Sequence, residues 1–200
     1  MFRLDLLEDP LEQFKLWYEE ASTLKKVYDP LTMTLATANA KARPTARIVL
    51  YKGITKGGFL IFTNYYSQKG IDLAENPYAA WVFYWPEIYK QVRGEGHVEK
   101  LTYEESKTYF ETRPYESQIS AWVSEQSQEI PNREYLVNRY TKYRKTFPKE
   151  MGVQCPQFWG GFRLVPTRME FWTGQDHRLH DRFCYFKEGN HKWRIIRLAP

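Results

Sequence analysis

The sequence has little cysteine and no long apolar run. Its only cysteines, Cys155 and Cys184, lie far apart in the 200-residue chain. Such a pair gives no disulfide framework and fits a reducing compartment. No apolar stretch approaches the ~18 residues of a membrane span, and acidic residues occur at the start, where a signal peptide needs an apolar run. We therefore expect a cytoplasmic protein without a membrane partner.

Nucleotide-binding signatures and charge runs are also absent. Neither G-x-G-x-x-G nor G-x-x-x-x-G-K-[ST] occurs, which argues against a Rossmann or P-loop site. The net charge of +5 comes from 29 basic and 24 acidic residues, with no run of five like charges. This mild excess favours anionic ligands, but its dispersal predicts no nucleic-acid partner. His177 and His180 lack the further ligands of a zinc site, so we expect no bound metal.

Aromatic residues and short alternating segments are abundant. The 7 Trp, 15 Tyr and 12 Phe suit a core, an interface or a pocket for a flat ligand. Apolar alternation bounded by turn residues predicts strands. They cover residues 32–38, 45–52, 59–63, 79–84, 89–100, 158–164, 168–172, 182–186 and 193–198. We expect a mainly β fold in which this antiparallel sheet closes into a Greek-key-like barrel.

Helices are predicted at the periphery of that barrel. Asp9-Pro10 begins one that runs to about residue 26, and Ser67 caps a short one. Thr102 and Glu105 form a capping box for a helix that ends at Pro114. A helical turn at 118–123 and a helix at 132–147 follow. We expect one domain over 1–200, with an N-terminal helical segment at 1–28 and a helical excursion at 102–148.

The segment 170–182, E-F-W-T-G-Q-D-H-R-L-H-D-R, concentrates charged planar donors after a strand. Arg178 can stack on a ring and grip oxyanions, and His180 can donate, accept or carry a proton near neutral pH. Together they suit an anionic aromatic ligand. A solvated basic turn is the alternative that the residues alone leave open.

Two other segments have the composition of phosphate sites. Residues 63–69 lead from a strand into a helix start with hydroxyls and Lys69, which favours an anion. Tyr109 and Arg113 share a helix face, and Ser117 follows. A plain N-cap and an exposed Tyr–Arg pair remain the alternatives. Arg47 and Lys52 are an odd number of residues apart, so on a regular strand they would face opposite sides and meet different ligands, or be surface cations.

These segments, in this order, resemble the pyridoxine/pyridoxamine 5'-phosphate oxidase family over about 9–200. The matching motifs are R-I-V-L-Y-K, F-T-N-x-x-S-x-K, Q-V-R-G-E-G, Y-F-x-x-R-P-x-x-S-Q-I, W-V-S-x-Q-S, F-W-G-G-F-R, E-F-W-x-G-x-x-H-R-L-H-D-R-F and a terminal R-L-A-P. The segment around Arg178 and the R-L-A-P ending are the most specific of these.

The resemblance implies an FMN-binding split β-barrel homodimer with FMN at the interface. It implies an oxidoreductase that converts pyridoxamine or pyridoxine 5'-phosphate to pyridoxal 5'-phosphate, with O2 giving H2O2. The implied FMN contacts are Arg47, Ile48, Val49, Leu50, Phe62, Thr63, Gln68, Lys69, Gln91, Gln126, Ser127, Trp172 and Arg182. The implied substrate contacts are Lys52, Tyr109, Arg113, Ser117, Arg178 and His180, of which Arg178 and His180 are the candidate catalytic residues.

The sequence departs from the family pattern at two places. The family has Arg-Lys after the serine, where this chain has Gln68-Lys69, so one cation of the FMN phosphate site is missing. The family also carries an N-terminal arm that closes over the substrate, and we expect this arm to be absent or short here. Both departures keep an alternative open: a split-barrel flavin or pyridoxal phosphate carrier with weak or no turnover.

Overall fold

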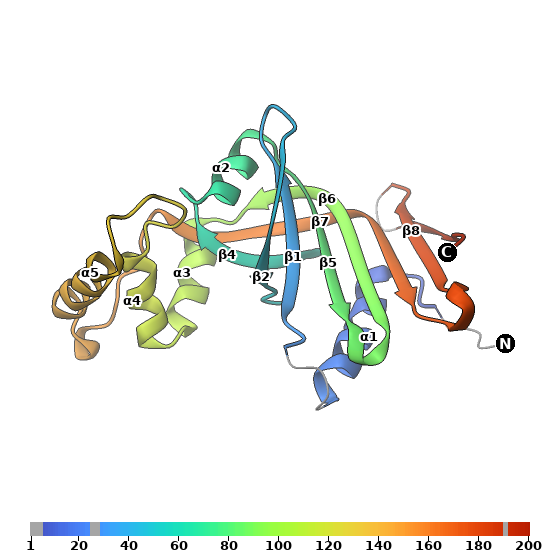
Figure 1. The fold of residues 1–200 in the computed structure, drawn as a ribbon, viewed down its shortest axis with the longest axis horizontal. Helices are drawn as coiled ribbons and strands as arrows, with labels where there is room; N and C mark the ends of the chain where they lie inside the picture. The colour runs from blue at the N-terminus through green and yellow to red at the C-terminus, as the bar shows by residue number, and fades with distance from the viewer. Residues whose placement is uncertain (1–5, 25–28, 190–191) are drawn as a thin grey trace.

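The computed structural model describes residues 6–24, 29–189 and 192–200. Antiparallel pairs link its strands into one sheet, shown in Figure 1. The strands are β1 (Thr32–Ala38), β2 (Pro44–Leu50), β3 (Ile54–Thr55), β4 (Gly58–Asn64), β5 (Tyr78–Trp85), β6 (Lys90–Lys100), β7 (Trp159–Thr173), β8 (Asp181–Lys187) and β9 (Trp193–Arg197). The predicted mainly antiparallel fold is confirmed.

The sheet curves back on itself. Its strand order is β2-β1-β5-β6-β7-β4-β3. The two ends of this path, β2 and β3, are separated in the chain only by residues 51–53. The Lys52 N–H donates to the Leu60 carbonyl of β4 at 2.9 Å, and the Leu60 N–H donates to the Gly53 carbonyl at 2.8 Å. The curved sheet thereby encloses the core as a barrel does.

Strand β7 serves two partners along one edge. It pairs with β6 along its other edge, while residues 159–164 pair with β4 and residues 168–173 pair with β8. Two separate strands were predicted here, and that prediction is wrong. Pro166 lies at a bulge, where the register shifts between Glu95 and Gly96. Because a bulge leaves one residue out of the ladder, a proline is tolerated there without ending the strand.

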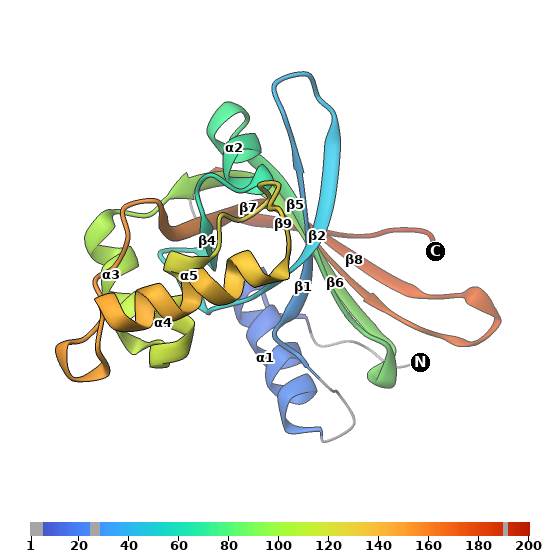
Figure 2. The same ribbon diagram turned by 60° about the vertical axis from the view of Figure 1, so that its left-hand side comes forward.

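The helices lie around the sheet. They are α1 (Pro10–Thr23), α2 (Gln68–Glu75), α3 (Tyr103–Thr112), α4 (Tyr115–Val123) and α5 (Arg133–Thr146). Figures 1 and 2 show α3, α4 and α5 grouped at the end of the molecule away from β8. None of the helices in the described ranges is long and apolar enough to cross a membrane.

Most predicted helix starts are confirmed by cap contacts. Asp9, Ser67 and Thr102 each accept a backbone N–H of the helix that follows. The residues beyond 24 that were predicted to extend α1 include 25–28, which lie outside the described residues. The predicted turn at 118–123 is instead the full helix α4. It starts directly after Pro114, because the Pro114 carbonyl accepts the N–H groups of Ser117 and Gln118.

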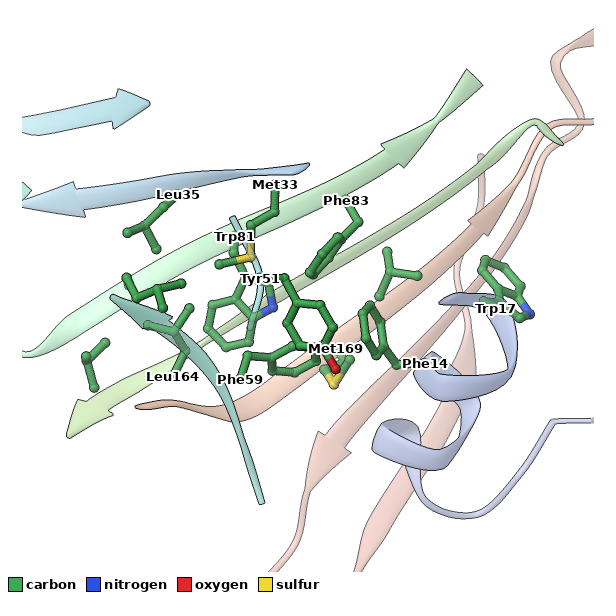
Figure 3. Packing of buried hydrophobic residues seen from close by; sticks show 14 of the residues in the cluster. Phe14, Trp17, Met33, Leu35, Tyr51, Phe59, Trp81, Phe83, Leu164 and Met169 are labelled. Atoms are coloured by element: carbon green, nitrogen blue, oxygen red, sulfur yellow. The ribbon is translucent and has the colours of Figure 1, made fainter. Parts of the chain in front are cut away.

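Aromatic rings fill the barrel. Figure 3 shows Phe14 of α1 pointing toward Tyr51, Phe59 and Phe83. The Phe14 ring centroid lies 4.8 Å from those of both Phe59 and Phe83. Aromatic pairs at such separations add to the free energy gained by burying their area. Helix α1 is therefore bound to the barrel through a buried face on which Phe14, together with Trp17 and Ala21, packs into the core.

We expect Phe14→Ala to lower the free energy of unfolding by about 3–5 kcal/mol, because it removes a buried ring and leaves a cavity. Urea denaturation measures this change. Leu16→Ala on the same helix is the control: Leu16 is 50% exposed, and its loss should change stability by about 0.5 kcal/mol or less. Equal losses for the two variants would show that α1 is not held by Phe14.

Candidate functional site

A cavity of about 810 Å³ opens between β2, β4, α2, α3 and α4. This volume lies in the range of small-molecule sites. Four cationic side chains line it, those of Arg47, Lys52, Lys69 and Arg113, and no carboxylate of the described residues does. The lining also contains Ile48, Val49, Leu50, Phe62, Thr63, Gln68, Tyr109, Ser117, Gln126 and Ser127. Fourteen of the predicted site residues thus share one positively charged cavity.

Lys69 lies at the start of α2 among neutral oxygens. Its ammonium lies 3.1 Å from Gln126 Oε1 and 3.3 Å from the hydroxyls of both Thr63 and Ser67. It is only 8% exposed, and no ion pair found among the described residues includes it. Burial, with a smaller contribution from Arg47, lowers the pKa of Lys69 to about 8. Burying a cation without a counter-ion is unfavourable, and a bound anion would offset this cost. The surroundings of Lys69 therefore favour an anionic ligand.

Arg47, by contrast, has a carboxylate behind it. Asp72 is buried 3.8 Å from Arg47 Nη2 and accepts the hydroxyl of Thr37 at 2.6 Å. Gln68 lines the cavity, yet its amide donates to Asp72 Oδ1 at 2.8 Å. Burial raises the pKa of Asp72, but these hydrogen bonds and Arg47 outweigh it, so its pKa lies below the usual value. Asp72 was not predicted as a residue of the site. Its i, i+4 spacing from Gln68 on a helix indicates that the two side chains can form a hydrogen bond.

The other end of the cavity holds Arg113 against an aromatic stack. The Phe62 and Tyr109 rings lie 3.8 Å apart, and the Arg113 guanidinium carbon lies 4.6 Å from the Trp159 ring. Burial lowers the pKa of Arg113. Its Nη1 is buried without a hydrogen-bond partner in the described part of the chain. An unsatisfied guanidinium nitrogen of this kind is a ready contact for an oxyanion. Trp159 was not predicted as a site residue.

The prediction that Arg47 and Lys52 face opposite sides is wrong. Strand β2 ends at Leu50, so the alternation of side chains does not extend to Lys52. The chain turns at 51–53, and both residues line the same cavity.

Five predicted site residues lie elsewhere: Gln91, Trp172, Arg178, His180 and Arg182. Gln91 pairs with Trp172 across β6 and β7, and Trp172 pairs with Arg182 across β7 and β8. We call these three residues the outer row. Neighbouring Val92 and Phe171 point into the core, so the outer row occupies the opposite face of the sheet. In Figure 1 the end of β7 and β8 lie far from α3 and α4.

The loop after β7 carries Arg178 and His180 beside the outer row. His177 and Arg178 have φ of 57° and 62°, a backbone conformation that non-glycine residues adopt at a cost and that often marks functional sites. The His180 ring packs against Trp172 at a tilt of 47°, with ring centroids 4.7 Å apart. The Gln175 N–H donates to His180 Nδ1 at 3.1 Å. Since that N–H can only donate, Nδ1 accepts, and the neutral ring carries its proton on Nε2.

Comparison with known proteins identifies the family. Residues 19–147 match the model of "Pyridoxamine 5'-phosphate oxidase", and 159–200 match the "Pyridoxine 5'-phosphate oxidase C-terminal dimerisation region". The chain belongs to the pyridoxine/pyridoxamine 5'-phosphate oxidase family. It is 71% identical to the Coxiella burnetii member over the full length of both chains, and 49% identical to that of Cupriavidus pinatubonensis over 98% of this chain and 91% of the relative. The predicted oxidoreductase class is thereby confirmed.

Solved structures show the same split barrel. PhzG from Burkholderia lata, in complex with tetrahydrophenazine-1-carboxylic acid, superposes with a TM-score of 0.89 at 28% identity, covering 98% of this chain and 95% of that one. An FMN-binding protein from Nostoc punctiforme has a TM-score of 0.74 at 13% identity, over 98% of this chain and 100% of that one. The latter likeness concerns the fold alone.

The position of Lys69 predicts pH-dependent binding of FMN. A protonated ammonium attracts the phosphate, and this attraction is lost as the pH rises through about 8. At pH 9, one unit above this pKa, only about a tenth of the Lys69 side chains still carry the proton. We therefore expect the dissociation constant of FMN to rise about tenfold from pH 7 to pH 9. Titration of the protein with FMN at each pH, followed by flavin fluorescence, measures the dissociation constant. Riboflavin, which has no phosphate, and Lys69→Met are the controls and should show little change. An equal pH dependence for riboflavin would contradict the assignment.

Proposed function

We propose that this protein oxidises pyridoxamine and pyridoxine 5'-phosphate to pyridoxal 5'-phosphate as an FMN-dependent enzyme with O2 as acceptor. FMN is its cofactor, and its working form is a homodimer. Residues 1–200 act as one domain in this account. The two buried cysteines, Cys155 and Cys184, are free, which fits the cytoplasmic location that we propose.

The observation that carries the proposal is that one cavity contains two separate cations, buried Lys69 and half-buried Arg113, with no ion-pair partner among the described residues. At one end, Lys69 has only neutral partners beside the N-terminus of α2. At the other, Arg113 Nη1 lacks a partner. A phosphorylated cofactor and a phosphorylated substrate would satisfy one each. In this arrangement Arg47, Thr63, Lys69, Gln126 and Ser127 hold the FMN phosphate, and Lys52, Tyr109, Arg113 and Ser117 hold the substrate phosphate.

The outer row completes the site only if a second copy supplies it. Thr63 pairs with Gly160 of β7, and Arg182 pairs with Trp172 of the same strand. Twelve residues of β7, up to about 40 Å of extended strand, separate these positions, so one ligand in an 810 Å³ cavity does not reach both. Ile48 and Leu50 beside the cavity are 62% and 44% exposed, as expected of a face that a partner covers.

FMN, when bound, would supply the two-electron redox chemistry of the oxidation, with O2 as the final acceptor giving H2O2. The protein supplies proximity and orientation. Arg178 covers the exposed face of the substrate ring and holds the ring in position. His180 donates a hydrogen bond from Nε2 to a ring substituent, because Gln175 occupies its Nδ1.

Two alternatives differ in substrate or turnover. The similarity to PhzG raises a fused-ring carboxylic acid as a substrate class, and a flavin carrier would bind FMN without turnover. The phosphate position proposed at Arg113 favours the phosphorylated substrate over the carboxylic acid, and the relatives named as oxidases favour turnover over a carrier.

The direct test of the proposal is product formation. We expect the purified protein to bind FMN and to release pyridoxal 5'-phosphate and H2O2 in equal amounts from pyridoxamine 5'-phosphate. Unphosphorylated pyridoxamine is the matched control and should react poorly. FMN binding without product would favour the carrier, and turnover of a phenazine precursor alone would favour the PhzG-like activity.

Arg113→Ala tests the substrate phosphate position. A charge-assisted hydrogen bond contributes about 1.5–3 kcal/mol, so KM should rise roughly ten- to a hundredfold while FMN affinity stays unchanged. Steady-state kinetics and FMN titration measure the two effects. Arg144→Ala on α5, with its side chain 53% exposed, is the control. If Arg113→Ala loses FMN instead, the two phosphate positions are exchanged.

A further inference from the structure

A buried carboxylate lies on the outward face of the sheet. Glu170 belongs to β7, pairs with Arg93 of β6 and stands two residues before Trp172, so its side chain is on the same face as the outer row. It is nevertheless only 2% exposed. Three arginines surround it, Arg93, Arg168 and Arg182.

Arg182 holds this carboxylate at two points. Its Nε donates to Oε1 at 2.8 Å, and its Nη2 donates to Oε2 at 3.2 Å. Arg93 donates to the same Oε2 from Nη2 at 2.5 Å and from Nε at 3.0 Å. Burial raises the pKa of Glu170, but the hydrogen bonds and charges of Arg182 and Arg93 outweigh it and hold the pKa below its usual value. Glu170 is therefore ionised at neutral pH.

The same guanidinium also binds the C-terminal segment. Arg182 Nη1 donates to the Ala199 carbonyl at 2.7 Å, and the Leu198 N–H donates to the Arg182 carbonyl at 2.9 Å. Of the five N–H groups of a guanidinium, these contacts use three. Two remain, one on each terminal nitrogen, and a side chain fixed at both Glu170 and Ala199 keeps them in one direction.

We infer that Glu170 is a positioning residue of the flavin site. It acts through Arg182, which it orients beside Trp172 and Gln91 so that the two unused N–H groups meet the cofactor. Without the carboxylate, the long Arg182 side chain regains its rotamers, and ordering it again on binding costs affinity. This inference rests on the FMN-dependent function proposed above.

A double-mutant cycle on FMN binding tests the inference. The variants are Glu170→Gln, which keeps the shape and removes the charge, Arg182→Met, and the two combined. We expect Glu170→Gln to weaken FMN binding roughly tenfold, the loss of about one charged hydrogen bond. Because Glu170 acts through Arg182, the combined variant should bind FMN no more weakly than Arg182→Met alone. The visible absorption band of bound flavin should shift in Glu170→Gln as well.

Glu99→Gln is the matched control for a purely structural role. Glu99 of β6 pairs with buried Arg163 of β7 at 3.0 Å, in the same two strands and away from the outer row. Its loss should lower the Tm of the FMN-free protein as Glu170→Gln does, but leave FMN affinity and the flavin spectrum unchanged. If Glu170→Gln does not fold, Glu170→Asp, which keeps the charge but shortens the reach, replaces it in the cycle.

The outcomes separate the inference from the proposed function. Failure of the wild type to bind FMN overturns both. If the wild type binds FMN and Glu170→Gln binds it with the same affinity, the inference alone is overturned. The inference is also overturned if the losses of FMN affinity in the two single variants add up in the combined variant.

Discussion

The hydrogen bonding of one long strand determines where the functional residues lie. Strand β7 satisfies one edge with β6, but β4 and β8 divide its other edge between them. Trp159 at its start therefore faces the cavity, whereas Glu170 and Trp172 near its end lie on the outward face beside Arg182. Each backbone group of a buried strand needs a partner, so β7 stays extended and its two ends stay apart. The cavity residues at its start and the outer row at its end therefore do not meet within one chain. This separation is the reason for proposing that a second copy completes the site.

The cations of the site are of two kinds. Arg47 and Arg182 each have a buried carboxylate behind them, Asp72 and Glu170 respectively. These arginines are oriented before any ligand arrives, which reduces the entropy that binding costs. Lys69 and Arg113 have no such partner among the described ion pairs, and burial lowers the pKa of both. An anion relieves the cost of burying these two positive charges, so they are best suited to determine affinity.

Local signals in the sequence were sufficient for the caps at Asp9, Ser67 and Thr102 and for most strands, because neighbouring residues determine those features. Family motifs supplied most of the candidate site residues. The bulge at Pro166 and the common cavity of Arg47 and Lys52 depend on strand ends and register, which no short pattern encodes. Glu170 was passed over as a strand residue because Arg93 lies 77 positions away. The role that we infer for Glu170 rests on this long-range pairing.

The measurement that tests the composite site most directly is complementation between two defective variants. Lys69→Met damages the cavity and Arg182→Met damages the outer row, so each homodimer should bind FMN weakly. A heterodimer, isolated with two different affinity tags, has one site carrying both changes and one carrying neither. We predict that it binds one FMN with nearly wild-type affinity. A heterodimer that binds no more tightly than its parents, while the wild type binds well, would contradict the account.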